Sequence, residues 1–445
     1  MSFVATAQCR LPRRIAQTAA SAILIAGMGA TTATQAAEGY LQNGYGARQK
    51  ALAGSGVADS TDATAISLNP AGLANVGNQA TVSISAISQR GGFESTGLGG
   101  VTADGHHNSD PGLVVVPNMA ANWRVNWGFA DAVGFSVYAN GGAKTHYSDF
   151  VNSNCALVGG TSGAICGGEL SLNMQQAYFS AALAKQLLPG LSLGLAPIVV
   201  RQTIEVDGVG LFAPFSVDPT QFSNKGTAES WGFGVRGGVE WKVLPTLRVG
   251  LAGNAPIHMS RFDAYSGLFA KQGRVDAPGT VQAGMAIDVA PELTFMADYK
   301  HIWYKSISAV GNPSTNLTAF GSDLGPGFGL NDVDVVKFGL EWRRSKDLTL
   351  RLGYSYNSAP ISGRDADLNI MTLGVVQNHF TGGLKYKMTN AMDLEMAAMY
   401  APKTSVSGPE LNNPGRNVTT HNSIFEVTVG AVYRFGAETQ AAPLK

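Results

Sequence analysis

The chain has 445 residues, only 14% of them charged, and its 31 basic and 31 acidic side chains cancel. Typical soluble proteins carry about 25% charged residues, so this low fraction, together with 55 glycines, favours closely packed strands that face lipid. The balanced charge argues against a nucleic-acid partner, which would need a concentrated basic surface.

The start of the chain predicts a secretory signal peptide. Three arginines within residues 10–14 precede an apolar run over residues 15–28, and small residues then lead to Ala36 and Ala37. A basic stretch, an apolar stretch and a small-residue cleavage site in this order are typical of such peptides, so we exclude residues 1–37 from the fold. No later segment has 18 uninterrupted apolar residues, so we expect no helical anchor, and a barrel is the remaining way to span a bilayer.

The next segment, residues 38–78, is rich in alanine, glycine and serine and shows little strict alternation of apolar and polar residues. This composition fits a small folded plug, or hatch, better than a strand that crosses a membrane. The sequence therefore predicts an N-terminal hatch.

Beyond the hatch, apolar and polar residues alternate along most of the chain. The last strand shows the pattern best: Phe425, Val429 and Tyr433 fall on one face, and Glu426 and Thr428 fall on the other. Similar segments cover residues 230–243, 336–343, 348–357 and 379–388. Alternation over about 10 residues, with aromatics at the strand ends, predicts an all-β fold, a transmembrane antiparallel β-barrel.

The connections between these strands fall into two sizes. Short turns are expected near residues 189, 245, 291, 346 and 391, and long loops near 90–112, 148–172, 206–227, 263–279, 310–332, 359–377 and 403–422. Short and long connections alternate, as periplasmic turns and extracellular loops do in outer-membrane barrels. The count gives about 14 strands over residues 79–435, followed by a short C-terminal tail over residues 436–445.

Two cysteines remain after the signal peptide is removed. Cys155 and Cys166 lie close together in a glycine-rich stretch, and in an exported protein such a pair most simply forms a disulfide that closes a loop. Two free thiols are the alternative. A metal site is poorly supported, because no second pair of cysteines or histidines has the spacing of zinc ligands.

Several short motifs resemble the FadL family of outer-membrane transporters for long-chain fatty acids and other hydrophobic compounds. In order along the chain, they are Gly44-Tyr45-Gly46-Ala47-Arg48, Ala53-Gly54-Ser55-Gly56-Val57-Ala58-Asp59, Asn69-Pro70-Ala71, Val116-Pro117-Asn118-Met119 and Trp231-Gly232-Phe233-Gly234. Each motif is weak, but their shared order covers nearly the whole mature chain. The resemblance implies a 14-stranded barrel whose lumen is blocked by a hatch that carries Asn69, Pro70 and Ala71.

The resemblance also implies a lateral exit. In the family, an inward kink in the third strand opens a gap in the barrel wall, through which a hydrophobic molecule slips into the membrane. Here the corresponding strand includes Asn140, Gly141 and Gly142, and glycine is where a strand bends most easily. The alternative is that the two glycines open an ordinary loop.

Apolar residues in two of the long loops are candidates for substrate capture. Leu211, Phe212 and Phe215 lie in one loop, and Leu268 and Phe269 lie in the next. Exposed apolar clusters are costly unless they bind something or pack on each other, so both binding and mutual packing of the loops are considered.

Arg201 lines up with a basic residue that the family uses near a bound carboxylate, a task that suits the planar guanidinium. An arginine paired with a carboxylate of the barrel or hatch is the alternative. A second basic partner does not align cleanly, and Lys300 and Lys305 are both candidates. The choice between a fatty acid and an uncharged hydrocarbon therefore stays open.

Other motifs carry no predicted chemistry. The G-x-G-x-x-G pattern of residues 232–237 lies inside an alternating strand, without the βαβ context of a dinucleotide site. His106 and His107 are read as part of a solvated loop. No serine, histidine and acid can be assembled into a catalytic site, so no enzyme, cofactor or metal is predicted.

The resulting hypothesis is passive uptake of long-chain fatty acids or related hydrophobic compounds across the outer membrane of a Gram-negative bacterium. Uptake of uncharged aromatic or aliphatic hydrocarbons is the alternative, followed by a general porin and a loop-based adhesin or receptor. The expected partners are hydrophobic small molecules and outer-membrane lipid, and the barrel is expected to be a monomer.

Overall fold

The computed structural model describes residues 37–160, 162–411 and 413–436. The predicted signal peptide up to residue 36 and the predicted tail from residue 437 onward lie outside the described residues.

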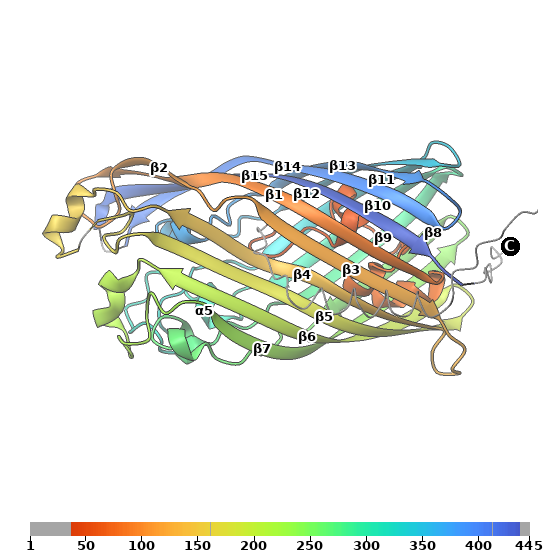
Figure 1. Cartoon of the computed structure of the whole chain (residues 1–445), viewed down its shortest axis with the longest axis horizontal. Helices are drawn as coiled ribbons and strands as arrows, with labels where there is room; N and C mark the ends of the chain where they lie inside the picture. The colour runs from red at the N-terminus through yellow and green to blue at the C-terminus, as the bar shows by residue number, and fades with distance from the viewer. Residues whose placement is uncertain (1–36, 161, 412, 437–445) are drawn as a thin grey trace, which may run out of the picture. The chain divides into compact units, whose positions relative to one another are not determined.

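Fourteen antiparallel strands close into a barrel, because each strand pairs with the next and β15 pairs with β1 (Figure 1). The strands are β1 (Gln79–Gly97), β3 (Val114–Arg124), β4 (Ala132–Tyr147), β5 (Leu170–Leu188), β6 (Leu191–Asp207), β7 (Ala228–Leu244), β8 (Leu247–Asn254), β9 (Gly279–Ala290), β10 (Leu293–Trp303), β11 (Val333–Arg343), β12 (Leu348–Asn357), β13 (Asn378–Lys387), β14 (Met392–Glu410) and β15 (Asn413–Arg434). An additional short strand, β2 (Gly105–Ser109), pairs with the last part of β1. The predicted fold class and strand number are confirmed.

Short helices occupy the N-terminal segment and the long connections. The N-terminal segment contains α2 (Gly46–Ala51), α3 (Ala65–Leu68) and η1 (Pro70–Asn75); the connections contain η2 (Ser153–Leu157), η3 (Gly210–Phe215), η4 (Asp263–Tyr265), α4 (Ala270–Gly273), α5 (Ser308–Gly311), η5 (Gly363–Asp365) and η6 (Leu368–Met371). Among the helices of the described residues, none has the length and apolar character needed to cross a membrane.

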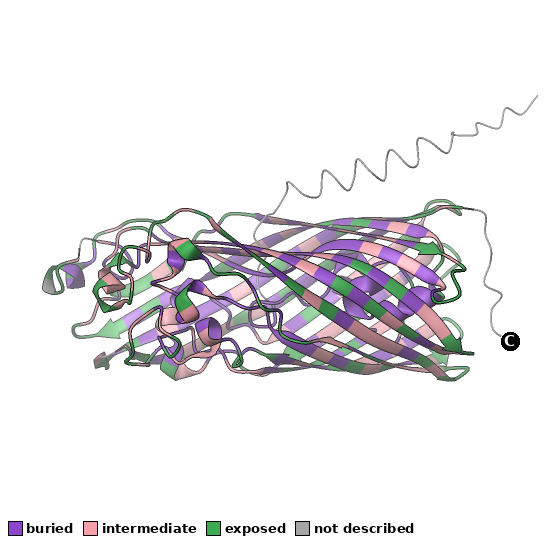
Figure 2. Ribbon diagram, turned by 90° about the horizontal axis from the view of Figure 1, so that it is seen from below, coloured by how far each residue is buried: buried purple, intermediate pink, exposed green. Residues whose placement is uncertain are grey.

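The long connections lie at one end of the barrel, called here the loop end, and the short turns lie at the other, the turn end. Buried and exposed residues alternate along the strands, as Figure 2 shows. In β15, Phe425 is 50% exposed whereas Glu426 is 4% exposed, and in β7 Phe233 is 77% exposed whereas Arg236 is 6% exposed. Apolar side chains therefore cover the outside of the barrel, and polar side chains face its interior, as the alternation predicted.

The predicted loop over residues 403–422 is wrong. The ladder between β14 and β15 continues through this region, from Thr404 paired with Asn422 to Pro409 paired with Asn417. Serine, threonine and valine alternate here and support an extended strand, whereas the prolines and glycines of the same region suggested a loop.

Residues 37–78, called here the N-terminal segment, lie inside the barrel, where the red ribbon of Figure 1 runs between the strands. Almost all of these residues are buried. Glycines on eight strands let the segment approach closely, because a Cβ added at any of them would come within 3.3 Å of an atom of the segment. They are Gly134, Gly141, Gly194, Gly238, Gly250, Gly339, Gly353, Gly383 and Gly430. The high glycine content thus reflects how the interior is filled.

Candidate functional site

The Asn69-Pro70-Ala71 motif anchors the N-terminal segment to β6 and β7. The Asn69 side-chain amide donates to the carbonyl of Val57 at 2.7 Å and to the carbonyl of Val239 at 2.9 Å. Gly194 and Gly238 face each other across the two strands; a Cβ at Gly238 would lie 2.0 Å from Asn69 Oδ1, and one at Gly194 would lie 2.2 Å from the Ala71 nitrogen. The motif therefore docks into a shallow depression that only glycines leave open.

Ion pairs hold the same segment against other strands. The buried carboxylate of Glu38 lies 2.6 Å from Lys300 and 2.5 Å from Lys337. Burial alone would raise the pKa of Glu38, but the two ammonium groups lower it below its ordinary value. Lys50 forms a comparable pair with Glu426 at 2.5 Å.

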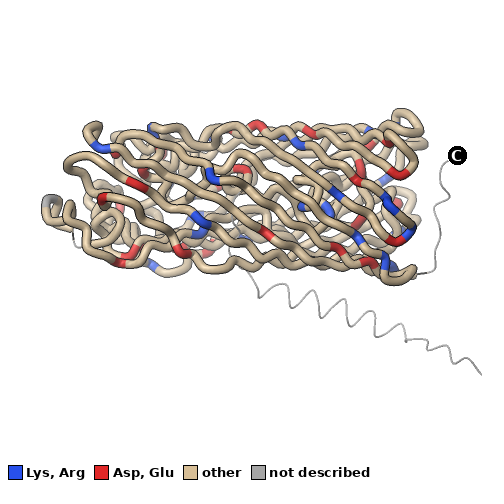
Figure 3. The backbone as a smooth tube through the Cα atoms, turned by 90° about the horizontal axis from the view of Figure 1, so that it is seen from above, with Lys and Arg blue, Asp and Glu red and all other residues tan. Residues whose placement is uncertain are grey.

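A third set of contacts joins Arg48 of the segment to the barrel wall. Its guanidinium lies 3.1 Å from Glu341, which also pairs with Arg351 at 2.9 Å. Figure 3 shows that basic and acidic residues are interspersed along the chain and are densest toward the turn end. Paired charges thus line the interior toward that end.

The β4 strand carries an irregularity at the predicted kink. Its register with β5 shifts between Ala139 and Gly141, so Asn140 is an extra residue in the ladder. The backbone of the N-terminal segment pairs with this bulge: Gln42 N–H donates to the Asn140 carbonyl, and Gly142 N–H donates to the Tyr40 carbonyl, both at 2.9 Å. A bulge here bends β4, and the segment contacts it directly.

The ladder between β3 and β4 ends beside this bulge. The ladder between β3 and β4 joins residues 119–124 to residues 132–137, and no ladder pair joins the described residues 138–147 of β4 to β3. Pro117 lies in the part of β3 without this partner, where a residue that has no N–H to donate is tolerated. The term wall opening is used below for this break between β3 and β4.

Three cavities extend from the loop end toward the N-terminal segment. The outer cavity has a volume of about 670 Å³ and is open to solvent. The middle cavity has a volume of about 50 Å³ and shares Ile165, Phe212, Phe320 and Met371 with the outer one. Because the same side chains line both, the two cavities adjoin each other.

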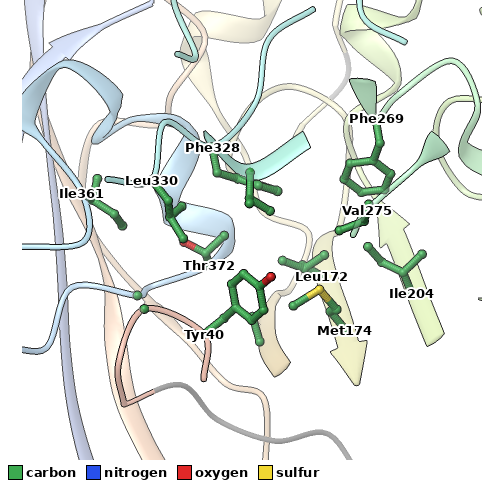
Figure 4. A pocket seen from close by; sticks show the side chains of 14 residues that line it. Tyr40, Leu172, Met174, Ile204, Phe269, Val275, Phe328, Leu330, Ile361 and Thr372 are labelled. Atoms are coloured by element: carbon green, nitrogen blue, oxygen red, sulfur yellow. The ribbon is translucent and has the colours of Figure 1, made fainter. Parts of the chain in front are cut away.

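The inner cavity, with a volume of about 30 Å³, shares Phe269 and Phe328 with the middle cavity. Figure 4 shows its apolar side chains converging from several elements, with Tyr40 of the N-terminal segment at its base. Ala143, which follows the β4 bulge, also lines it. The cavities therefore form a series from the loop end to the kinked strand.

The charged groups that line this series are acidic. No lysine, arginine or histidine is among the described residues that line the three cavities, whereas Asp367 and Glu410 line the outer cavity. Glu410 is paired with the buried Arg416 at 3.2 Å, and burial raises the pKa of Asp367 to about 6. The negative charge that an anionic ligand would meet in the outer cavity at neutral pH therefore comes from Asp367.

Four of the five predicted loop residues line these cavities. Phe215 lines the outer cavity, Phe212 the outer and middle ones, Leu268 the middle one, and Phe269 the middle and inner ones. Leu211 lies on the same short helix as Phe212 but is not among the lining residues. The structure brings the two loops together, and a role of these residues in substrate binding stays a prediction.

Arg201 lies away from the cavities. It occupies the outward face of β6, opposite Trp231 of β7, and its guanidinium pairs with Glu229 through two hydrogen bonds of 2.9 Å. The candidate second bases are also separated from the cavities, because Lys300 is buried against Glu38 and Lys305 is exposed in the loop after β10. Binding of a substrate carboxylate by Arg201 stays a prediction that these contacts do not support.

The predicted disulfide between Cys155 and Cys166 is present. It closes the loop after β4, and Ile165, next to Cys166, lines the outer and middle cavities. The amides of Asn152 and Asn154 donate to the carbonyls of residues 101 and 102 at 2.9 and 3.0 Å. The disulfide loop is therefore part of the cavity wall.

The sequence did not single out the strand residues of the inner cavity. Leu172, Met174 and Ile204 face inward at the loop ends of β5 and β6. Apolar residues at inward positions are the signal that could have identified them, because most inward positions of this barrel are polar. This signal can be read only once the strand register shows which positions face inward.

Comparisons with known proteins agree with this architecture. The family model described as "Outer membrane protein transport protein (OMPP1/FadL/TodX)" matches residues 23–435. No curated protein shows a significant match to the chain. Three solved structures have a similar fold: the P. putida toluene transporter TodX (TM-score 0.63, 17% identity), a Pseudomonas aeruginosa FadL homologue (0.63, 14%) and the Ralstonia pickettii toluene transporter TbuX (0.59, 18%).

The similarity extends over almost the full length of these chains. It covers 89% of this chain and 100% of TodX, 89% and 100% for the FadL homologue, and 88% and 99% for TbuX. The family match, the closed barrel and its apolar outer face lead to one assignment. The chain belongs to the OMPP1/FadL/TodX family of outer-membrane transport proteins.

Proposed function

We propose that this outer-membrane protein takes up long-chain fatty acids or related hydrophobic compounds passively and releases them sideways into the membrane. The observation that carries the proposal is the series of apolar cavities that leads from the loop end to the wall opening. The toluene transporters with a similar fold support a hydrophobic substrate. The proposal assigns the chain no catalytic step and no partner subunit.

Capture takes place in the outer cavity. Its rim carries exposed apolar side chains, with Phe215 68% exposed and Leu317 92% exposed. Phe212 then separates the outer from the middle cavity, and Phe269 separates the middle from the inner one. A hydrophobic molecule would thus exchange one apolar contact surface for the next without returning to water.

Release requires residues 38–78 of the N-terminal segment to act as a hatch that moves. Tyr40 forms the base of the inner cavity, and its carbonyl and the Gln42 N–H hold the β4 bulge. A shift of this segment about the Asn69-Pro70-Ala71 anchor would free Asn140, Gly141 and Gly142 and widen the wall opening. Transfer into lipid is downhill by about 0.8 kcal/mol per methylene, so no energy source is needed.

Uncharged hydrocarbons are the second candidate class of substrate. This class is favoured by the acidic side chain of Asp367 in the outer cavity and by the absence of basic side chains from the described lining residues. Fatty acids and hydrocarbons would follow the same apolar path. They differ because only a fatty acid brings a carboxylate into the outer cavity.

The proposal is tested by substituting neighbouring residues of one short helix. Phe212→Ala should lower uptake of a radiolabelled hydrocarbon or fatty acid into cells several-fold, because it removes the side chain that joins two cavities. Leu211→Ala is the matched control and should retain uptake within about twofold, since truncations that remove no binding contact are commonly near neutral.

Heat-dependent migration in gels would verify that both variants fold as barrels. Equal uptake by wild type, Phe212→Ala and a deletion strain would contradict the proposal. Swelling of protein-containing liposomes in sugar solutions would instead support an open porin.

A further inference from the structure

Below the inner cavity, a layer of buried polar side chains interrupts the apolar path. Met174 and Ile204 line the cavity and are paired across β5 and β6, and the next inward pair toward the turn end is Gln176 and Gln202. Gln176 is 1% exposed and Gln202 is 0% exposed. Two facing glutamines therefore lie one inward position below the apolar lining of the cavity.

The polar atoms of both glutamines lack hydrogen bonds of good geometry. This holds for the carbonyl oxygen and the amide nitrogen of Gln176 and Gln202 and for the hydroxyls of Tyr40 and Tyr178, although Tyr40 lies close enough to Gln176, and Tyr178 to Asn140, to interact weakly. These tyrosines are 5% and 2% exposed. A buried polar group without a partner destabilises the fold, so several such groups in one place point to a ligand that hydrogen-bonds to them.

The unpaired groups converge on the kinked strand. Gln176 is the ladder partner of Gly141, and a Cβ added at Gly141 would lie 2.8 Å from Gln176 Oε1, 2.9 Å from the Tyr40 carbonyl oxygen and 3.1 Å from the Tyr40 ring. Tyr178 faces inward one step further along β5 and packs against Tyr138 in a tilted arrangement, with ring centroids 5.4 Å apart. The polar layer thus lies at the level of the wall opening.

We propose that Gln176, Gln202 and Tyr40 form a subsite for the neutral polar head group of a hydrophobic substrate, with a hydroxyl as the preferred chemistry. The inference rests on the proposed function, since the head group is bound as the apolar body passes through the series of cavities. An amide and a phenol each donate and accept, as a hydroxyl does. Neither glutamine carries a charge that would repay desolvation of a carboxylate.

This subsite would select among hydrophobic compounds just before their exit. A hydrocarbon leaves the amide groups unpaired, whereas an alcohol or phenol pairs with them. The preference for a hydroxyl over a hydrocarbon therefore arises from the polar layer below the inner cavity. It is independent of the acidic groups that line the outer cavity.

The test compares toluene, p-cresol and p-toluate, which share a ring and differ in the polar group. Binding of each radiolabelled compound to the full protein in liposomes is measured for wild type and for the double variant Gln176→Met, Gln202→Met. Methionine keeps the volume and removes the hydrogen bonds. Binding of p-cresol should weaken by about fivefold to tenfold, as expected for one or two lost hydrogen bonds, while toluene binding stays within about twofold.

Gln186→Met is the matched control, because Gln186 lies on the same strand near the turn end, away from the cavities. This substitution should change the binding of neither p-cresol nor toluene. An unchanged ratio of p-cresol to toluene affinity in the double variant would overturn the inference, and the layer would then hold only water. Preferential loss of p-toluate binding would also overturn it, in favour of a carboxylate site. Failure of wild type to bind or admit either toluene or a radiolabelled long-chain fatty acid would instead count against the proposed function.

Discussion

At the scale of single residues, glycine and asparagine determine how the N-terminal segment meets the wall. The facing glycines Gly194 and Gly238 leave room for Asn69 and Pro70, and the Asn69 amide uses both of its hydrogens on carbonyls. One of these carbonyls belongs to the segment and the other to β7. Asn69 is therefore the residue that links the internal structure of the segment to the barrel.

Asn69→Ala should loosen this link by about 2 kcal/mol, because two donated hydrogen bonds are lost and two buried carbonyls lose a donor. We expect faster hydrogen–deuterium exchange over residues 38–78, measured by mass spectrometry, with the strands unchanged. Asn126→Ala, in the exposed turn after β3, is the control. Equal protection of the segment in Asn69→Ala and wild type would contradict this role.

At the scale of elements, β4 combines a bulge with the end of its ladder to β3. The bulge at Asn140 coincides with the end of that ladder, and the backbone of the N-terminal segment hydrogen-bonds to β4 at this point. A strand held by a few hydrogen bonds to a separate segment can separate more easily than a strand held by two ladders.

Deleting Asn140 should restore a continuous register between β4 and β5 and close the wall opening. Uptake of a hydrophobic substrate should then fall to the level of a deletion strain, while the protein still migrates as a folded barrel in gels without heating. Asn140→Ala keeps the residue count, and therefore the bulge, and should retain most of the uptake. Full uptake by the deletion variant would show that release does not depend on the bulge.

At the scale of the whole barrel, buried ion pairs connect the N-terminal segment to strands that are distant in sequence. Glu38 pairs with β10 and β11, Arg48 with β11, and Lys50 with β15. Removing one member of such a pair leaves a buried charge without compensation, which costs more than removing both. The segment and the wall should therefore unfold together.

Lys50→Met should destabilise the barrel by about 3 kcal/mol, because Glu426 would remain buried and unpaired. Combining it with Glu426→Gln should recover a large part of this loss. Urea unfolding in detergent, followed by tryptophan fluorescence, measures both variants. Additive effects of the two substitutions would contradict a direct coupling between the segment and β15.

Much of the fold could be predicted because alternation is a local property. Phe233 and Phe425 point outward and their polar neighbours point inward, as a period of two requires. Cysteine spacing likewise predicted the disulfide. Arg201 was harder to place, because Val199 and Val200 put apolar residues on both faces of its strand and leave the inward face ambiguous.

The sequence by itself determined that the chain forms an amphipathic barrel of about 14 strands and that Leu211, Phe212, Phe215, Leu268 and Phe269 are candidate capture residues. Only the tertiary structure decided which loops meet to form the cavities, where the ladder between β3 and β4 ends and which inward residues the N-terminal segment touches. The reason is physical: side-chain alternation depends on neighbours two residues apart, whereas the cavities depend on strand register and on contacts such as that between Tyr40 and Tyr304, which are 264 residues apart in the chain.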